Sequence, residues 1–260
     1  MKNFWELVEK VIEESDVIIE VLDARMPDIT RNKKAENLVK LAKKSLIFVL
    51  NKSDLIPEKL AKDYRDELRK ISPCISVSTR ERHGITLLKK KMFEIAKKRS
   101  KQEFVKVGVI GYPNTGKSSI VNSLTGRKKA RVGSRAGQTK GLQWIRISSD
   151  MGLIDTPGIV PSTNEDDEVK HALIGALNPS KINDPEIVAR KIVEMFVVVD
   201  KEHFENFYKI NIGDKDFEEI ISEIGNSRNM LKKGGVIDER RVYITMIHDW
   251  QKGRLLLKGT

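Results

Sequence analysis

The stretch from Gly111 to Ser118, with the sequence GYPNTGKS, constrains the fold of this chain more than any other feature. It matches G-x-x-x-x-G-K-[ST], the pattern of a phosphate-binding loop. The apolar, β-branched run Phe104 to Ile110 before it predicts a buried strand, and Ser119 to Leu124 after it predict a helix. Because the motif works between a strand and a helix, this context favours a phosphate site over a glycine-rich turn that carries a chance lysine.

The chemistry of such a loop follows from its geometry. Glycines let the backbone wrap a phosphate group, and successive N–H groups at a helix N-terminus point at the anion. Lys117 would reach the β- and γ-phosphates of a nucleotide, and the Ser118 hydroxyl would ligate Mg²⁺. The nucleotide contacts predicted for this segment are Asn114, Thr115, Gly116, Lys117, Ser118 and Ser119.

A second motif, Asn51-Lys52-Ser53-Asp54, follows the strand predicted for Ser45 to Leu50. N-K-x-D after a strand is the guanine-reading signature of GTPases. The Asp54 carboxylate can accept hydrogen bonds from guanine N1–H and the 2-amino group, and adenine, which offers neither, would be rejected. Asn51 can contact the opposite edge of the base, and the aliphatic stem of Lys52 can lie against the ring. Alone these residues suit an ordinary polar turn, but beside a phosphate loop they predict guanine binding.

The short strand predicted for Pro73 to Val77 runs into a loop of small residues. Ser78 and Thr79 in this loop can present backbone N–H groups to guanine O6, a signal that has meaning only through its position. The only cysteine of the chain, Cys74, lies in the same strand and excludes an internal disulfide. We expect it to be a small buried apolar residue.

The remaining signals concern the γ-phosphate and its metal. Asp155, at the end of a strand predicted for Gly152 to Ile154, would hold Mg²⁺ through water, and the Gly158 N–H would contact the γ-phosphate. Thr139 lies where a γ-phosphate-sensing threonine would ligate Mg²⁺. The predicted catalytic residues are Lys117, Asn114, Thr139 and Gly158, and the predicted metal ligands are Ser118, Thr139 and Asp155.

The order of these elements is unusual. A Ras-like chain runs from the phosphate loop through the threonine and D-x-x-G to N-K-x-D and the small-residue loop, in the order G1 to G5. Here N-K-x-D and the Ser78 loop come first, which gives the order G4-G5-G1-G2-G3 and predicts a circular permutation. Such a change is tolerated because domain termini lie at the surface, where a short exposed segment can join them. The charged segment Lys97 to Glu103 is the predicted joint.

In this combination and order the motifs resemble those of the YlqF/YawG-type circularly permuted GTPases, which act in large ribosomal subunit assembly. The resemblance covers nearly the whole chain. It rests on Asp23-Ala24-Arg25-x-Pro27, Asn51-Lys52-Ser53-Asp54, residues 111–119, Gly137-x-Thr139-Lys140, Asp155-Thr156-Pro157-Gly158-Ile159 and Leu231-x-x-Gly234-Gly235-x-x-Asp238. It implies an α/β fold in residues 1–168, a circularly permuted, Ras-like P-loop GTPase domain whose mostly parallel sheet carries helices on both faces. An all-helical C-terminal domain is implied for residues 169–260.

Two features depart from familiar GTPases. Some bacterial members of the family carry a histidine in an N-terminal Gly-His-Met segment, proposed to help hydrolysis, but residues 1–15 hold no histidine. Ras-like enzymes place a water-orienting Gln near D-x-x-G, where this chain has Ile159 and Val160.

Asn114 resembles the K⁺-ligating Asn of cation-stimulated GTPases, and K⁺ there would neutralise charge at the β–γ bridge. A loop-stabilising side chain is the alternative role for Asn114. We expect slow intrinsic hydrolysis, stimulated by K⁺ and by a ribosomal particle.

The formal net charge of +11 favours a polyanionic partner. Residues 171–260 hold equal numbers of basic and acidic residues, so the whole excess lies in residues 1–170. The helix predicted for Ile85 to Lys98 has a lysine-rich outer face, which is either solvated or faces RNA. In the C-terminal domain, Arg240 and Arg241 are the candidate rRNA contacts, and a solvated face is again the alternative.

The sequence therefore predicts a GTP-hydrolysing switch that binds GTP or GDP and a precursor of the large ribosomal subunit or its rRNA. The segment from Ile159 to Glu168 leads from the nucleotide-sensing loop into the second domain, so γ-phosphate binding would reorient that domain. The alternative function is a nucleotide-gated RNA- or protein-binding module in another pathway, with incidental hydrolysis. Without a signal peptide or a membrane-spanning run, we expect a cytoplasmic monomer with no membrane partner.

Overall fold

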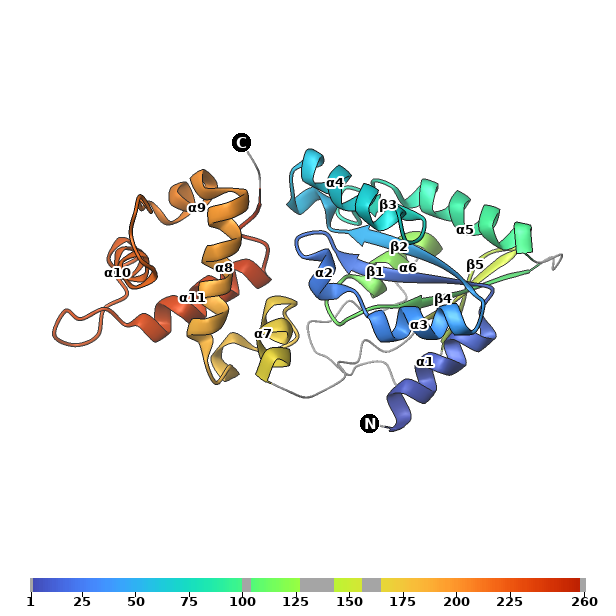
Figure 1. Ribbon diagram of the computed structural model, residues 1–260, viewed down its shortest axis with the longest axis horizontal. Coiled ribbons are helices and arrows are strands. Elements are labelled where there is room, and N and C mark those ends of the chain that lie inside the picture. The colour runs from blue at the N-terminus through green and yellow to red at the C-terminus, as the bar shows by residue number, and fades with distance from the viewer. Residues whose placement is uncertain (1, 100–103, 127–142, 156–164, 258–260) are drawn as a thin grey trace. The chain divides into compact units, whose positions relative to one another are not determined.

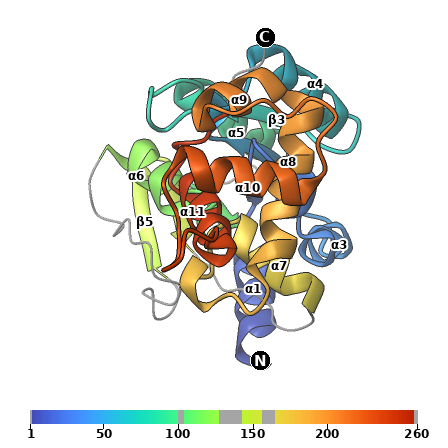
Figure 2. The same cartoon turned by 90° about the vertical axis from the view of Figure 1, so that its left-hand side faces the viewer.

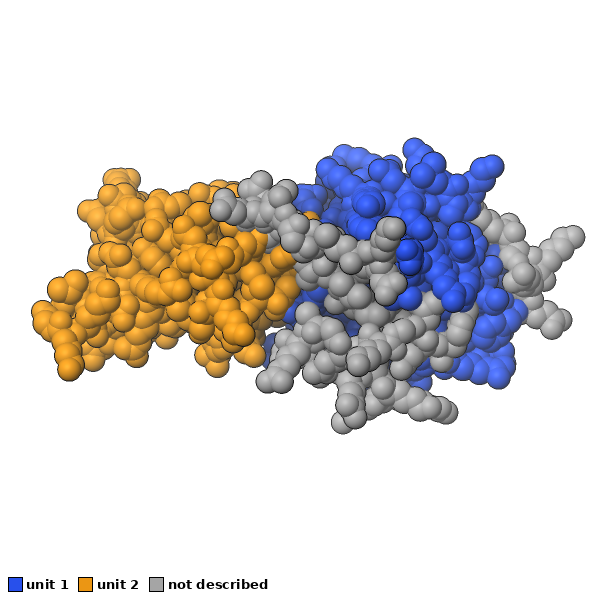
Figure 3. All heavy atoms as spheres, turned by 90° about the horizontal axis from the view of Figure 1, so that it is seen from below, with its two compact units in different colours: residues 1–54, 58–161 blue, residues 55–57, 162–260 orange. Residues whose placement is uncertain are grey.

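The computed structural model describes residues 2–99, 104–126, 143–155 and 165–257 of the chain. The chain forms two compact units, coloured separately in Figure 3. Unit 1 comprises residues 1–54 and 58–161, and unit 2 comprises residues 55–57 and 162–260. The domain boundary expected after residue 168 falls inside helix α7 (Glu165–Leu173), which lies in unit 2.

Unit 1 is built on a six-stranded sheet with the strand order β3-β2-β1-β4-β6-β5 (Figure 1). The strands are β1 (Val17–Asp23), β2 (Ser45–Asn51), β3 (Cys74–Val77), β4 (Val105–Ile110), β5 (Gln143–Ser148) and β6 (Met151–Asp155). All neighbouring strands pair in parallel except β5, which runs antiparallel to β6. The mostly parallel sheet implied by the resemblance is confirmed.

Helices cover both faces of this sheet. Those of unit 1 are α1 (Lys2–Glu14), α2 (Pro27–Thr30), α3 (Lys33–Leu41), α4 (Glu58–Arg69), α5 (Ile85–Arg99) and α6 (Lys117–Thr125). A 3-10 turn η1 (Ser53–Leu55) begins in unit 1, and its last residue belongs to unit 2. Because successive side chains of a strand point to opposite faces, β1 supplies Ile19 to one core and Ile18 to the other. Both faces of β1 are therefore buried, which explains its nearly continuous apolar sequence.

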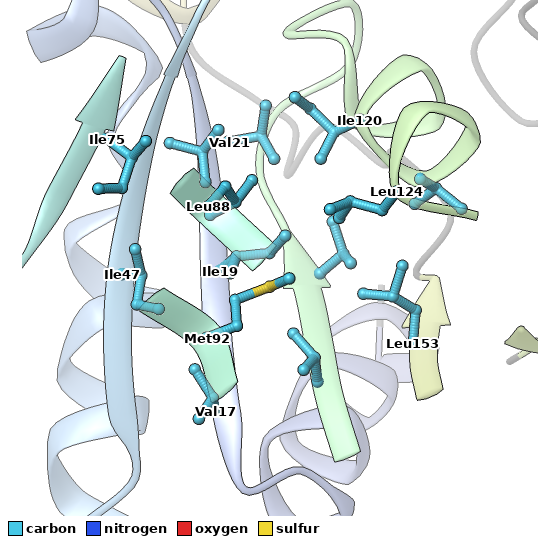
Figure 4. Close-up of a cluster of buried hydrophobic side chains, with 14 of the residues drawn as sticks. Val17, Ile19, Val21, Ile47, Ile75, Leu88, Met92, Ile120, Leu124 and Leu153 are labelled. Carbon is cyan, nitrogen blue, oxygen red and sulfur yellow. The ribbon is translucent and has the colours of Figure 1, made fainter. Parts of the chain in front are cut away.

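The larger core lies between the sheet and helices α5 and α6. Leu88 and Met92 of α5, together with Ile120 and Leu124 of α6, point toward the apolar side chains of the strands (Figure 4). On the other face, α1 and α3 pack against Ile18 and Ile110 with their own apolar residues. This packing holds β1 and β4 side by side, which brings the ends of these two strands together.

Cys74 is buried in β3, and burial raises the pKa of its thiol to about 12. The thiol is therefore neutral over the physiological range, as expected for a small buried apolar residue.

Two local elements differ from the sequence-based expectation. Helix α2 was not predicted, since four residues are too short to show helical periodicity; Pro27 at its first position suits a helix start. Helix α6 begins at Lys117 rather than Ser119, because Gly116 adopts a left-handed conformation (φ +96°) and ends the loop there. The predicted joint from Lys97 to Glu103 begins in the last turn of α5, and residues 100–103 lie outside the described residues.

The described part of unit 2 is helical apart from one short bridge. Its helices are α7, α8 (Pro185–Val199), α9 (Lys201–Tyr208), α10 (Phe217–Ser227) and α11 (Glu239–Gln251), with a 3-10 turn η2 (Pro179–Lys181). Helix α11 packs against α7, α8 and α10 (Figure 2). At its centre Trp250 is fully buried, meets Phe196 edge-on at 6.1 Å and donates a hydrogen bond to the Leu173 carbonyl oxygen at 2.9 Å.

The motif Leu231-x-x-Gly234-Gly235-x-x-Asp238 connects α10 to α11. Leu231 pairs with Ile237 in an antiparallel bridge, and Gly234 (φ +97°) and Gly235 (φ +81°) make the tight turn between them. The Asp238 carboxylate accepts a hydrogen bond from the Arg241 N–H at the start of α11. The motif therefore has a structural explanation, as a turn followed by a helix cap.

In the described ranges, none of the helices combines the length and the apolar composition that crossing a lipid bilayer requires.

Adjacent leucines on α5 offer a matched test of the larger core. Leu88 is fully buried, whereas Leu87 is 55% exposed. We expect Leu88→Ala to lower the free energy of unfolding of unit 1 by about 2–5 kcal/mol, because it opens a cavity against the sheet. Leu87→Ala should change it by less than about 0.5 kcal/mol. Hydrogen exchange of unit 1 peptides across a urea series measures both, and equal losses would contradict the packing described.

Candidate nucleotide-binding site

The chemical motifs of unit 1 lie at one edge of the sheet, where the parallel strands end. In the strand register Asp23 of β1 is opposite Asn51 of β2, which is opposite Val77 of β3. On the other side of β1, Val109 of β4 is opposite Asp155, the last residue of β6. Ligands of open α/β sheets bind outside these carboxyl ends, so the register makes this edge the candidate site.

The phosphate loop leaves β4 and returns into α6. A Cβ atom on Gly111 (φ +142°) would lie 2.6 Å from the Val21 carbonyl oxygen, so only glycine lets the loop start this close to β1. The buried Lys117 ammonium donates hydrogen bonds to the carbonyl oxygens of Gly111 and Tyr112 at 2.8 and 2.7 Å. The loop thus holds a positive charge at the N-terminus of α6, where a phosphate group is favoured.

The predicted base-reading motif touches the phosphate loop directly. The buried Asn51 side chain donates a hydrogen bond from Nδ2 to the Thr115 carbonyl oxygen at 2.8 Å, across 64 residues of sequence. Because a carbonyl oxygen can only accept, the amide nitrogen of Asn51 must face it. A Cβ atom on Gly116 would lie 2.1 Å from the same nitrogen. Glycine is therefore needed at position 116 for close approach as well as for its positive φ.

The two residues expected to read the base follow at once. Lys52 has a left-handed backbone (φ +62°), and the turn η1 places the half-buried Asp54 immediately beyond the end of β2. Burial lowers the pKa of Lys52, against the opposing charges of Asp23 and Asp54. Asn51, Lys52 and Asp54 thus lie together beside the phosphate loop.

A cluster of charges that the motifs alone do not reveal lies behind Lys52. The Lys52 ammonium donates to Asp23 Oδ2 at 2.6 Å, and Arg25 binds both oxygens of the same carboxylate, with Nε–Oδ1 at 3.0 Å and Nη2–Oδ2 at 2.8 Å. Burial opposes the charged form of Asp23, but Arg25 and Lys52 outweigh it and hold the pKa of Asp23 far below its ordinary value. The signal in the sequence is D-x-R at the end of one buried strand and N-K-x-D at the end of another.

The small-residue loop after β3 is closed on itself. The backbones of Ser78 and His83 exchange two hydrogen bonds of 3.1 and 3.0 Å, and the Ser78 hydroxyl accepts one from the Glu81 N–H at 3.0 Å. The N–H of Ser78 is therefore engaged within the loop. We expect any base contact from this loop to come from Thr79, which is half-buried beside it.

Of the predicted metal ligands, the structure describes the position of two. Ser118 is half-buried in the first turn of α6, and Asp155 ends β6, the strand next to the phosphate-loop strand. A serine hydroxyl and a carboxylate are oxygen ligands of the kind that Mg²⁺ prefers. Thr139 and Gly158 lie outside the described residues. Ser119 and Asn114 (φ +59°) are both half-buried, on either side of the loop's Gly116-Lys117 turn.

Two protein-family models match this chain. The model described as RsgA GTPase matches residues 6–163, and the model described as 50S ribosome-binding GTPase matches residues 106–232.

Curated relatives match over nearly the full length of this chain. A GTP-binding protein of Methanocaldococcus jannaschii is 40% identical over 96% of this chain and 65% of its own length. Nucleolar GTP-binding protein 2 of Saccharomyces cerevisiae is 35% identical over 98% of this chain and 52% of its own length. The chain thus spans between about half and two thirds of these relatives.

Solved structures of YlqF are similar as well. A GDP-bound YlqF has a TM-score of 0.66 and 26% identity, covering 96% of this chain and 95% of that chain. The GNP-bound YlqF from T. maritima has the same TM-score of 0.66 and 26% identity, covering 98% and 95%.

Two glycines with positive φ give a matched test of the contact between the motifs. In Gly116→Ala the new Cβ must displace the Asn51 amide, whereas a Cβ at Gly126 (φ +65°) meets nothing within 4 Å. We expect both variants to lose stability from backbone strain. Only Gly116→Ala should also weaken GDP binding, by about tenfold or more, because a buried hydrogen bond is broken. Isothermal titration with GDP measures this, and equal affinities of the two variants would refute the contact's importance.

Proposed function

Because this chain belongs to the YlqF-type circularly permuted GTPases, we propose that it binds GTP, hydrolyses it to GDP and phosphate, and acts as a switch in large ribosomal subunit assembly. One observation carries the nucleotide part of this proposal, the hydrogen bond from Asn51 Nδ2 to the Thr115 carbonyl oxygen. It joins a base-reading motif to a phosphate-binding loop, and only a nucleotide needs both. Support for the ribosomal part comes from the matching family's description, 50S ribosome-binding GTPase, and from relatives named nucleolar GTP-binding proteins.

In this proposal Asp54 selects guanine by accepting hydrogen bonds from N1–H and the 2-amino group. Adenine has no hydrogen-bond donor at either position. The second hydrogen of Asn51 Nδ2 is directed to the base, and the Lys52 stem lies against the ring. Thr79 approaches O6 from the loop after β3, and Ser78, whose N–H is bonded to the His83 carbonyl oxygen, holds that loop in shape. The specificity for GTP over ATP then follows from the half-buried Asp54 carboxylate, because a bound base would remove its water and an adenine would leave it unpaired.

The phosphates are assigned to the loop and the start of α6. The N–H groups from Asn114 to Ser119 surround them, and the Lys117 ammonium exchanges its carbonyl partners for the β- and γ-phosphates. Ser118, Thr139 and Asp155 are the proposed ligands of Mg²⁺, whose charge offsets that of the phosphates when bound. The Gly158 N–H is the proposed sensor of the γ-phosphate.

Hydrolysis by this site is proposed to be slow without help. Ile159 and Val160 follow D-T-P-G, and neither apolar side chain can orient a water molecule. Asn114 is the proposed ligand of K⁺, which would add positive charge near the β–γ bridge. The alternative, that Asn114 only stabilises the loop, fits its left-handed backbone (φ +59°), which Asn tolerates better than most residues.

The proposed contacts with rRNA lie on basic surfaces of each unit. On α5, Lys90 and Lys97 are exposed, whereas Lys91 pairs with Glu94 at 3.2 Å. In unit 2, Arg240 and Arg241 are both exposed, and Arg240 donates a hydrogen bond to the Ile182 carbonyl oxygen at 3.3 Å. Arg241 is therefore the better candidate for an rRNA contact, because the Arg240 guanidinium is already bonded to the Ile182 carbonyl oxygen.

Location, oligomeric state and domain movement stay predictions. We predict a monomer in which the segment after Gly158 transmits the nucleotide state to the helical domain. A cytoplasmic location is the prediction from the sequence, whereas several relatives are named nucleolar GTP-binding proteins.

The alternative function is a nucleotide-gated RNA- or protein-binding module of another pathway, in which hydrolysis is incidental. It shares the guanine site and the basic surfaces with the leading proposal. The two differ in whether the large ribosomal subunit is the partner.

Sedimentation with large ribosomal subunits separates these functions. We expect the chain to pellet with subunits in a non-hydrolysable GTP analogue and to remain in solution with GDP, because the γ-phosphate favours the subunit-binding state. GTP itself should give an intermediate result that declines as hydrolysis proceeds. Lys117→Ala, which lacks the phosphate-binding ammonium, serves as the control and should pellet equally in all nucleotides. Equal pelleting of the unchanged chain in all nucleotides would contradict the switch, and no pelleting would favour the alternative.

Turnover in KCl and NaCl tests the role of Asn114. We expect GTP hydrolysis to be faster in KCl by about tenfold or more, since one well-placed positive charge contributes at least this much. Asn114→Asp keeps a residue that tolerates the left-handed backbone but changes the charge of the ligand, so it should change the ratio of the two rates. Equal rates in both salts, with Asn114→Asp also unchanged, would rule out the cation site.

A further inference from the structure

We propose that Asp23 and Arg25 are positioning residues for Lys52, and that they set the affinity for guanine nucleotides by holding the lysine stem in the place where the base packs. This inference rests on the proposed guanine site and adds a part that the base-reading motif does not contain. Asp23 is the last residue of β1 and Arg25 follows two residues later, so both lie one strand away from Lys52 in the sheet and far from it in sequence.

The geometry fixes Lys52 at both ends. Its backbone is held at the end of β2, where the Ala24 N–H donates to the Asn51 carbonyl oxygen at 2.8 Å. Its ammonium is held by Asp23 Oδ2 at 2.6 Å. The aliphatic stem between these two points has little freedom left, although a lysine in solution samples many rotamers. A guanine ring that packs on the stem therefore meets a surface that is already ordered.

Asp23 is itself fixed from two sides. Arg25 donates hydrogen bonds to both of its carboxylate oxygens. The side chains of Asp23 and Arg25 are each only 2% exposed, whereas that of Lys52 is 23% exposed. The Asp23 N–H donates to the Thr30 hydroxyl at 3.1 Å, which ties the residue to helix α2. The carboxylate thus presents Oδ2 to Lys52 from a rigid frame, and the lysine is the one member of the cluster that reaches toward solvent.

Stability alone gives a poor reason for such a cluster. Moving ions out of water is unfavourable, and well-packed apolar residues in place of a buried ion pair are often as stable or more so. A charged cluster at the carboxyl edge is better explained by what it does to Lys52. If Lys52 had to be ordered by the nucleotide, the affinity would fall by about twofold to tenfold, the usual effect of immobilising one flexible side chain.

Unit 1 also contains a second, similar ion pair. Arg31 binds Glu36 with two hydrogen bonds of 2.9 and 2.7 Å, and the two side chains are 14% and 12% exposed. This pair has the same chemistry and a similar geometry as Arg25 with Asp23, but neither residue touches Lys52 in a described contact. Glu36→Gln is therefore the control for a loss that is only structural.

The experiment measures GDP affinity by isothermal titration for the unchanged chain, Asp23→Asn, Lys52→Met, their double variant and Glu36→Gln. We expect Asp23→Asn to weaken GDP binding by about tenfold. Lys52→Met keeps an apolar stem but removes the ammonium, so it should weaken binding by a similar factor, and the double variant should be no weaker than Lys52→Met. Glu36→Gln should leave GDP affinity within about twofold while lowering the melting temperature.

Kinetics add a readout that a loss of stability alone would not produce. Because the base packs on Lys52 in the ground state and the transition state alike, Asp23→Asn should raise KM for GTP and leave kcat at saturating GTP unchanged. If Asp23→Asn fails to fold by circular dichroism, Lys52→Met carries the test. Unchanged GDP affinity of Lys52→Met would then overturn the proposal.

The outcomes also separate this inference from the proposed function. Additive losses in the double variant, or equal losses of affinity in Asp23→Asn and Glu36→Gln, would overturn the positioning role alone. Failure of the unchanged chain to bind GDP would overturn the guanine site and this inference together.

Discussion

The hydrogen bond from the Asn51 amide to the Thr115 carbonyl oxygen is the interaction on which the site depends. It is buried, its geometry admits only one orientation of the amide, and it joins the last residue of β2 to the loop that follows β4. It requires β2, β1 and β4 to lie in order within one sheet, since β1 separates the two strands. It also requires glycine at position 116, where any side chain would push the amide away.

The permuted order of the motifs becomes understandable in terms of this sheet. The chain first forms β1, β2 and β3, which lie side by side in the sheet. Helix α5 then packs across one face of the sheet and leads the chain back to β4, which pairs with β1. Every motif still emerges at the carboxyl edge, because what matters for a nucleotide is the position of a strand in the sheet, and the order along the chain is free. Leu88 and Met92 of α5 bury the crossing against the strands and so secure this return.

The sequence predicted most of the strands, the helices around them and the phosphate loop, because apolar runs and glycine spacing are local signals. It placed Asn51 at the base but gave no hint of its bond to Thr115, which depends on β2 and β4 lying two places apart in the sheet, with β1 between them. The cluster of Asp23, Arg25 and Lys52 was not predicted for the same reason, because its members lie at the ends of two different strands. Helix α2 was not predicted because four residues are too few to show helical periodicity.

A crystal structure of the chain with GDP tests the central claim most directly. The account predicts one bound nucleotide at the carboxyl edge, with guanine N1 and the 2-amino group within about 3 Å of the Asp54 carboxylate. The same nucleotide should place its β-phosphate at the Lys117 ammonium and the first N–H groups of α6. A GDP molecule whose phosphates occupy the loop while its base lies away from Asp54, or one bound elsewhere, would contradict it.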